Sequence, residues 1–142
     1  MSRRIYENAD SLNKEGELIR RFLEVQYPGA TYMKLPISYR LDVGIVQGGV
    51  ITAFAEFKCR NIRMDLYDSF FISLSKLMIL QDYASRNLVA HLVVGWTDYM
   101  GVFEPRMTDE FEIRPGGRTD RGDPADMEPM AHISIASFNV FS

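Results

Sequence analysis

The apolar run LVAHLVVGW at residues 88–96 is the feature that most constrains the fold. A run of this length that is rich in Val and Leu is typical of a strand whose two faces are both buried. Other elements must therefore pack on both sides of the sheet that contains it. His91 lies inside this run, and we interpret it as a core histidine rather than a ligand.

Two helices and several further strands are expected around this central strand. Apolar residues at helical spacing predict a first helix that begins at Asp10 or Ser11 and ends before Pro28, and a second helix at about 65–87. Extended segments are expected at 31–35, 39–46, 50–59, 101–104, 111–114 and 132–140. This order predicts an α/β fold in which a mixed central sheet is flanked by helices, with an additional C-terminal β-hairpin.

Composition limits the class of protein. The chain has 142 residues, of which 46% are apolar and 25% charged. This fits one domain over residues 1–142, with a core at about 10–104 and a hairpin and long loop at 105–142. The single cysteine, Cys59, and two histidines give no Cys/His cluster at zinc spacing. No apolar run is long enough to span a membrane, so we expect a cytoplasmic protein with no membrane partner.

Charge is distributed unevenly along the chain. The net charge is -3 at pH 7, yet residues 1–63 carry 10 basic and 7 acidic side chains, whereas residues 64–142 carry 6 and 12. The basic residues 1–63 are compatible with a polyanionic partner, although the net charge of the whole chain would argue against one.

Asp42, Glu56 and Lys58 are the best candidates for chemistry. Side chains alternate along a strand, so Glu56 and Lys58 project from the same face. If Asp42 shares this face, the two carboxylates favour Mg²⁺ or Mn²⁺, and the lysine can orient water or stabilise charge on a phosphate. The alternative is that Asp42 simply ends a strand, while Glu56 and Lys58 form a salt bridge on a solvated face.

The turn between the second and third extended segments decides where Asp42 points. A turn of two residues, 48–49, would pair Asp42 with Ala55, on the face away from Glu56. A turn of three residues, 47–49, would pair it with Phe54, on the face of Glu56. We expect the three-residue turn, which brings both carboxylates within reach of one cation.

Glu15 is a third candidate acid. It lies in the middle of the apolar stripe of the first helix, where a carboxylate is costly unless it is paired or bound to a metal. Glu17 lies on the opposite face, where it is expected to be a solvated partner of Arg20 and Arg21. The alternative for Glu15 is that it only stabilises the start of the helix.

In order and spacing, these parts resemble the PD-(D/E)xK nuclease superfamily, and within it compact Holliday-junction-resolvase-like and phage-encoded nucleases. The resemblance covers about residues 10–104, and it rests on helical Glu15, on Asp42, and on Glu56-x-Lys58 before a helix and an apolar strand. It implies a restriction-endonuclease-like core. It also implies a metal-dependent DNA endonuclease that leaves 3′-hydroxyl and 5′-phosphate ends, including on branched or structured DNA.

The resemblance further implies a role for each residue. Mg²⁺ or Mn²⁺ would be held by Asp42, Glu56, Glu15 and the backbone carbonyl of Phe57. Lys58 would be the catalytic lysine.

Other basic residues are candidates for contact with DNA. Lys76, in the second helix, stands where related enzymes often carry a Gln or Lys that faces the scissile phosphate; a solvated helix lysine is the alternative. Positive side chains near the motif or in the late loop can neutralise phosphates. The residues expected to do so are Arg20, Arg60, Arg63, Arg118 and Arg121.

Two further functions and one assembly state fit the sequence. The chain is alternatively a catalytically inactive nucleic-acid-binding or assembly module with the same fold, or a subunit whose acidic loop at 115–129 docks a protein. Ile79 and Tyr83 give the second helix more apolar surface than one sheet contact requires, which predicts a homodimer. The alternative is that the late hairpin covers them.

Overall fold

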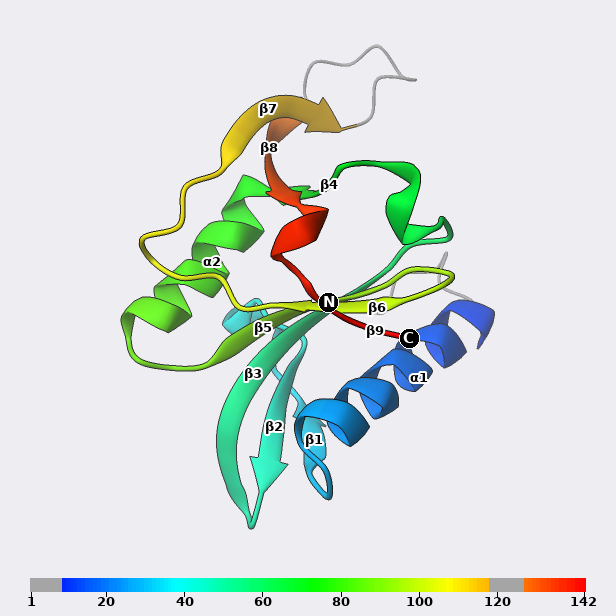
Figure 1. Ribbon diagram of the computed structural model, residues 1–142. Helices are drawn as coiled ribbons and strands as arrows, with labels where there is room; N and C mark the ends of the chain where they lie inside the picture. The colour runs from blue at the N-terminus through cyan, green and yellow to red at the C-terminus, as the bar shows by residue number, and fades with distance from the viewer. Residues whose placement is uncertain (1–8, 118–126) are drawn as a thin grey trace.

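The computed structural model describes residues 9–117 and 127–142, and these residues form a mixed α/β structure with two sheets (Figure 1). The main sheet has the strand order β1-β2-β3-β5-β6-β9, and the second sheet has the order β4-β8-β7. The elements are α1 (Ala9–Gln26), β1 (Thr31–Lys34), β2 (Val43–Gln47), β3 (Val50–Cys59), β4 (Ser69–Ser73), α2 (Leu74–Ser85), β5 (Ala90–Gly95), β6 (Met100–Phe103), β7 (Glu112–Gly117), β8 (Met127–Ser134) and β9 (Asn139–Phe141). No helix within the described residues is long and apolar enough to cross a membrane.

The main sheet separates two apolar cores. On one face, α1 packs residues such as Leu18 and Phe22 against β2 and β3. On the other face, α2 and the second sheet pack against β5. β5 lies parallel to β3 in the middle of the sheet, and residues 90–94 are buried. This confirms the central strand predicted from the apolar run, and with it the mixed sheet flanked by helices.

The turn of the β2–β3 hairpin is shorter than we expected. Gln47 pairs with Val50, which leaves only Gly48 and Gly49 in the turn. These glycines have φ angles of 57° and 78°, in the left-handed region that two-residue hairpin turns require. The expected three-residue turn is therefore wrong.

A β-bulge nevertheless restores the face expected for Asp42. The register shifts at Thr52, which lies between the pairs Ile45–Ala53 and Val46–Ile51 and has no partner in this ladder. One extra residue on β3 moves every later pair by one position. Beyond the shift Val43 pairs with Ala55, so the same register places Asp42 opposite Glu56, on the same face.

The second helix begins at Leu74, not near Asp65 as we expected, because residues 69–73 form β4 instead. In this segment the buried Phe70 and Ile72 alternate with the exposed Phe71, a period of two that fits a strand. β8 supplies a hydrogen-bonding partner along the whole of β4. Sequence periodicity alone did not reveal this distant partner.

The expected C-terminal hairpin is present with different bounds. β7 and β8 pair over residues 112–117 and 127–134, rather than 111–114 and 132–140, so both ends of the expected loop at 115–129 belong to strands. β8 also pairs with β4, and after a short 3-10 turn (Ile135–Ser137) β9 pairs with β6 at the edge of the main sheet. The C-terminal residues therefore connect the two sheets.

Ile79 and Tyr83 are covered by this chain itself. Both are half-buried against the core between α2 and the main sheet, and the ring of Tyr83 lies 5.0 Å from that of Phe54. This part of α2 therefore gives no argument for a dimer.

Candidate active site

Asp42 directly precedes β2 and is fixed against β3. Its backbone N–H donates to the carbonyl oxygen of Ala55 at 3.2 Å, and its carboxylate Oδ2 accepts a hydrogen bond from the N–H of Phe57 at 2.8 Å. These two bonds hold the half-buried carboxylate beside the β3 residue between them, Glu56.

Glu56 is a buried acid held between two lysines. Its side chain is nearly inaccessible, at 4% exposure. Oε2 lies 3.5 Å from Nζ of Lys58, and Oε1 lies 3.5 Å from Nζ of Lys76. Burial raises the pKa of the Glu56 carboxyl and the charge of Asp42 raises it further, whereas Lys76 and Lys58 lower it. Glu56 and Lys58 are therefore not a salt bridge on a solvated face.

α2 supports the turn that presents Asp42. Arg40 adopts a left-handed conformation, with φ 62°, which is uncommon for a residue other than glycine. Lys76 donates a hydrogen bond to the carbonyl oxygen of Arg40, and the hydroxyl of Tyr83 donates to that of Tyr39 at 2.9 Å. Lys76 thus contacts both this turn and Glu56, so it is not a solvated helix lysine.

Sequence reasoning missed this turn. We expected a strand to begin at Tyr39, whereas residues 37–39 form a 3-10 turn and β2 begins only at Val43. The preceding Pro36 was the available signal, because proline commonly begins a turn.

Glu15 lies apart from the two other acids. Its carboxylate pairs with Lys34 of β1 at 3.8 Å, and its charge contributes to raising the pKa of the Cys59 thiol. Cys59 alternates with Lys58 along β3, so these contacts are on the α1 side of the sheet. Within residues 9–117 and 127–142, no three or more His, Cys, Asp or Glu side chains are grouped so that they could hold a metal ion. The structure thus brings Asp42 and Glu56 together but does not add Glu15.

The pair of carboxylates fits a hard divalent cation. Oε1 of Glu56 is buried and, apart from the approach of Lys76, has no hydrogen-bond partner in the described structure. A buried oxygen that lacks a donor is costly unless another positive group satisfies it. Mg²⁺ takes oxygen ligands, keeps several waters, and is commonly held by only one or two protein carboxylates. Asp42 and Glu56 meet this requirement.

The arginines expected to contact DNA differ in their surroundings. Arg20 and Arg63 are exposed, and each is paired with an acid close to it in the sequence. Arg60 is half-buried just beyond the end of β3. Arg118 and Arg121 lie outside the described residues.

The sequence matches a protein-family model described as "Phage putative PDDEXK endonuclease" over residues 1–141. The chain belongs to this family. The resemblance to PD-(D/E)xK nucleases is therefore confirmed, and the family places the chain among the nucleases. No curated protein matches the sequence.

The fold of this family member is similar to a solved structure of Hjc, a Holliday junction resolvase from the archaeal hyperthermophile Archaeoglobus fulgidus. The two share a TM-score of 0.52 and 15% sequence identity, over 88% of this chain and 87% of Hjc. At this identity the likeness shows the fold alone, and it confirms the expected restriction-endonuclease-like core.

Proposed function

We propose that the chain is a DNA endonuclease that requires Mg²⁺ or Mn²⁺ and leaves 3′-hydroxyl and 5′-phosphate ends. The observation that carries the proposal is the buried carboxylate of Glu56, aligned with Asp42 and 3.5 Å from Lys58. Two adjacent carboxylates supply oxygen ligands for a divalent cation. A lysine beside them lies where negative charge develops when a phosphodiester is displaced.

Each residue has a distinct part in this proposal. Asp42 and Glu56 would hold the ion together with the backbone carbonyl of Phe57, and a bound ion would stabilise the charged phosphate and make a bound water more acidic. Lys58 donates hydrogen bonds to the attacking water or to a phosphate oxygen. Lys76 holds Glu56 from its other side and faces the scissile phosphate. Glu15 stays a candidate ligand that would have to leave Lys34.

A plasmid-nicking assay with Mg²⁺ tests the activity. We expect Glu56→Gln and Lys58→Met each to slow nicking by at least about 100-fold, because the first removes a charge that would hold the ion and the second removes a charge that acts on the reacting phosphate. Glu24→Gln, an exposed acid paired with Arg20, is the matched control and should keep the wild-type rate. If nicking survives both active-site substitutions, this site is not the one that cuts DNA.

A metal titration separates the enzyme from an inactive nucleic-acid-binding or assembly module of the same fold. Isothermal titration with Mn²⁺ should show binding that Asp42→Asn abolishes and that Asp82→Asn, the same substitution at an exposed acid of α2, leaves intact. If Mn²⁺ does not bind, or binds equally well to Asp42→Asn, the inactive module is favoured.

The proposal extends to branched or structured DNA and to a homodimer. The solved structure with a similar fold is named a Holliday junction resolvase, so a four-way junction should be compared with a linear duplex of the same sequence. Cutting two strands symmetrically needs two active sites, which is the reason to expect a dimer. Faster cleavage of the duplex than of the junction would remove the first extension, and sedimentation of the chain as a monomer on its substrate would remove the second.

A further inference from the structure

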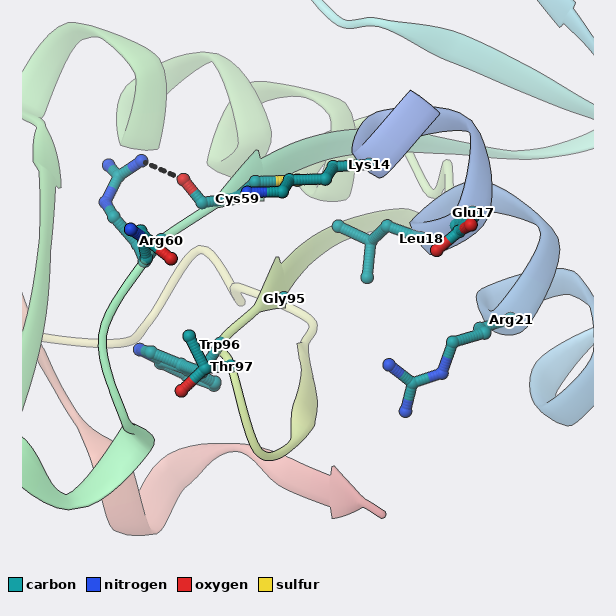
Figure 2. A pocket seen from close by; sticks show the side chains of 10 residues that line it. Lys14, Glu17, Leu18, Arg21, Cys59, Arg60, Gly95, Trp96 and Thr97 are labelled. Atoms are coloured by element: carbon teal, nitrogen blue, oxygen red, sulfur yellow. Dashed lines mark hydrogen bonds between the residues drawn. The ribbon is translucent and has the colours of Figure 1, made fainter. Parts of the chain in front are cut away.

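A cavity of about 430 Å³ lies between α1 and the carboxyl ends of β3 and β5. Figure 2 shows Lys14, Leu18 and Arg21 approaching it from α1, opposite Cys59 and Trp96 at the strand ends. Its volume is within the range of about 300–1,000 Å³ that is typical of small-ligand sites. In open α/β sheets, ligands commonly bind just outside the carboxyl ends of parallel strands. The proposed active site does not use this cavity, because Glu56 and Lys58 project from the other face of β3.

Arg60 brings a positive charge to the rim of the cavity, where its guanidinium is turned toward Phe70 of the core on the other side of the sheet. Its half-buried guanidinium donates to the carbonyl oxygen of Cys59 at 3.2 Å and lies 5.0 Å from the centre of the Phe70 ring. In the part of the chain that the structure describes, no carboxylate forms an ion pair with it. A cation that has lost much of its water without gaining a carboxylate is costly. An anionic ligand in the cavity would supply the missing partner.

Other lining residues extend the positive charge. Lys14 and Arg21 also line the cavity, and among the described residues that line it the one acid is Glu17. Arg21 donates to the carbonyl oxygen of Ser142 at 3.1 Å, which holds its side chain between α1 and the C-terminal strand. Three cations around one small cavity favour a phosphate group.

The remaining walls are apolar and rigid. Leu18 and Trp96 line the cavity, and both belong to the two cores of the sheet. Trp96 is held edge-on by the rings of Phe70 and Phe138. An apolar wall beside a cationic one suits a nucleotide, whose phosphate is anionic and whose base has an apolar face. A base inside a duplex is stacked and paired, so it must be unpaired to enter such a cavity.

We infer that this cavity binds one unpaired nucleotide of the DNA strand that the active site cuts. Its phosphate would lie at Arg60, Lys14 and Arg21, and its base against the edges that the otherwise buried Leu18 and Trp96 expose to the cavity. The inference rests on the proposed function and narrows the substrate to DNA with an unpaired stretch beside the cut. The cavity and the active site lie on opposite faces of the main sheet, at the carboxyl end of β3 where Cys59 follows Lys58, so the bound strand would pass around this end.

Alkylation of Cys59 reports directly on the cavity. Cys59 lines it, is exposed, and is the only cysteine of the chain. Burial raises the pKa of the Cys59 thiol, so N-ethylmaleimide is added at alkaline pH, where the thiolate forms. The rate of alkylation is followed by mass spectrometry of the intact protein. Ca²⁺ replaces Mg²⁺, and a gel confirms that the DNA remains uncut.

The two probes are an oligothymidine single strand and a blunt duplex of the same length. A strand that occupies the cavity should slow alkylation by the factor 1 + [L]/Kd, about tenfold at a tenfold excess over Kd. The blunt duplex should give little protection. Equal protection by both, or protection by neither, would overturn the inference.

Charge variants provide a second measurement. Affinity for the single strand is measured over a range of salt for Arg60→Gln and for the double variant Lys14→Gln, Arg21→Gln. Each lost phosphate contact should lower the slope of log K against log[salt] by about 0.7. Arg86→Gln removes an exposed arginine paired with Asp82 on α2 and should keep the wild-type slope. The double variant changes two polar side chains of α1 that belong to neither apolar core, so it remains informative if Arg60→Gln does not fold.

Failure of this inference is distinguishable from failure of the proposed function. If the protein nicks DNA but all variants keep the wild-type affinity and slope, the cavity assignment is wrong and the nuclease assignment stands. If the protein does not nick DNA but the single strand protects Cys59, the cavity assignment stands without the catalytic one.

Discussion

Acid should destabilise this protein through one buried side chain, His91. The imidazole is 2% exposed between α1 and β5, and its Nε2 lies 2.6 Å from the hydroxyl of Tyr27. Its Nδ1 is buried and has no hydrogen-bond partner in the described structure. Burial lowers the pKa of His91 from its ordinary 6.5 to about 4, because removal from water disfavours the charged imidazolium.

The sign and size of the effect follow from this pKa. Below pH 6.5 the unfolded chain takes up a proton at His91, whereas the folded chain stays neutral there down to a pH of about 4. The free energy of unfolding is therefore highest above pH 6.5 and falls as the pH decreases through this window. With about 1.4 kcal/mol for each pH unit between the two pKa values, the loss approaches about 3 kcal/mol. This is a large part of the stability of a typical small protein.

Urea unfolding of the wild type and of His91→Gln, at pH values from above 6.5 down to about 4, measures this loss. Carboxylates also contribute to acid unfolding, so the informative quantity is the difference between the two proteins. This difference in the free energy of unfolding should be constant above pH 6.5. Below pH 6.5 it should change in favour of the variant. His132→Gln is the matched control, since His132 is not buried and removing it should leave the loss in place. If the wild type and His91→Gln lose stability in parallel, the buried neutral histidine is not the cause.

Two further predictions concern the active site and the core. Lys76→Met should slow Mg²⁺-dependent nicking by about 10–100-fold, because it removes the cation that holds Glu56; an unchanged rate would show that this contact does not position the carboxylate. Gly101→Ala should destabilise the fold by about 1–3 kcal/mol in urea unfolding, because a Cβ there would lie 2.7 Å from the ring of Trp96. Gly16→Ala, with nothing within 4 Å of the added Cβ, is the control and should be neutral or stabilising; equal stability of the two variants would contradict the packing argument.

The sequence predicted the right face for Asp42, but from the wrong hairpin and with the wrong partner, since Asp42 lies opposite Glu56 and not Phe54. Alternation along β3 correctly placed Glu56 and Lys58 on one face, since this follows from strand geometry alone. The position of Asp42 depends on the turn and on every residue between the turn and the site. The shorter turn would have moved Asp42 to the other face, and the bulge at Thr52 moved it back. A bulge has no reliable local signal, so this compensation could be found only in the structure.

Contacts between distant segments were the other feature that the sequence did not reveal. Phe70 and Ile72 fit a helix or a strand equally well until β8 is known to lie beside them. Lys76 gave no indication that it would reach Glu56, because the two are brought together by the packing of α2 on the sheet. Glu15 was expected in the middle of the apolar stripe of α1, but it is only half-buried, and its partner Lys34 belongs to a strand whose position could not be predicted.

The pairing of β9 with β6 affects how the chain can fold during synthesis. β6 is complete when residues 100–103 have left the ribosome, but its outer edge stays open until residues 139–141 follow. β4 likewise waits for β8. Open strand edges pair readily with other chains. Until residues 127–141 have left the ribosome, the nascent chain thus carries two unfinished sheets, with open edges at β4 and β6 that are exposed to aggregation.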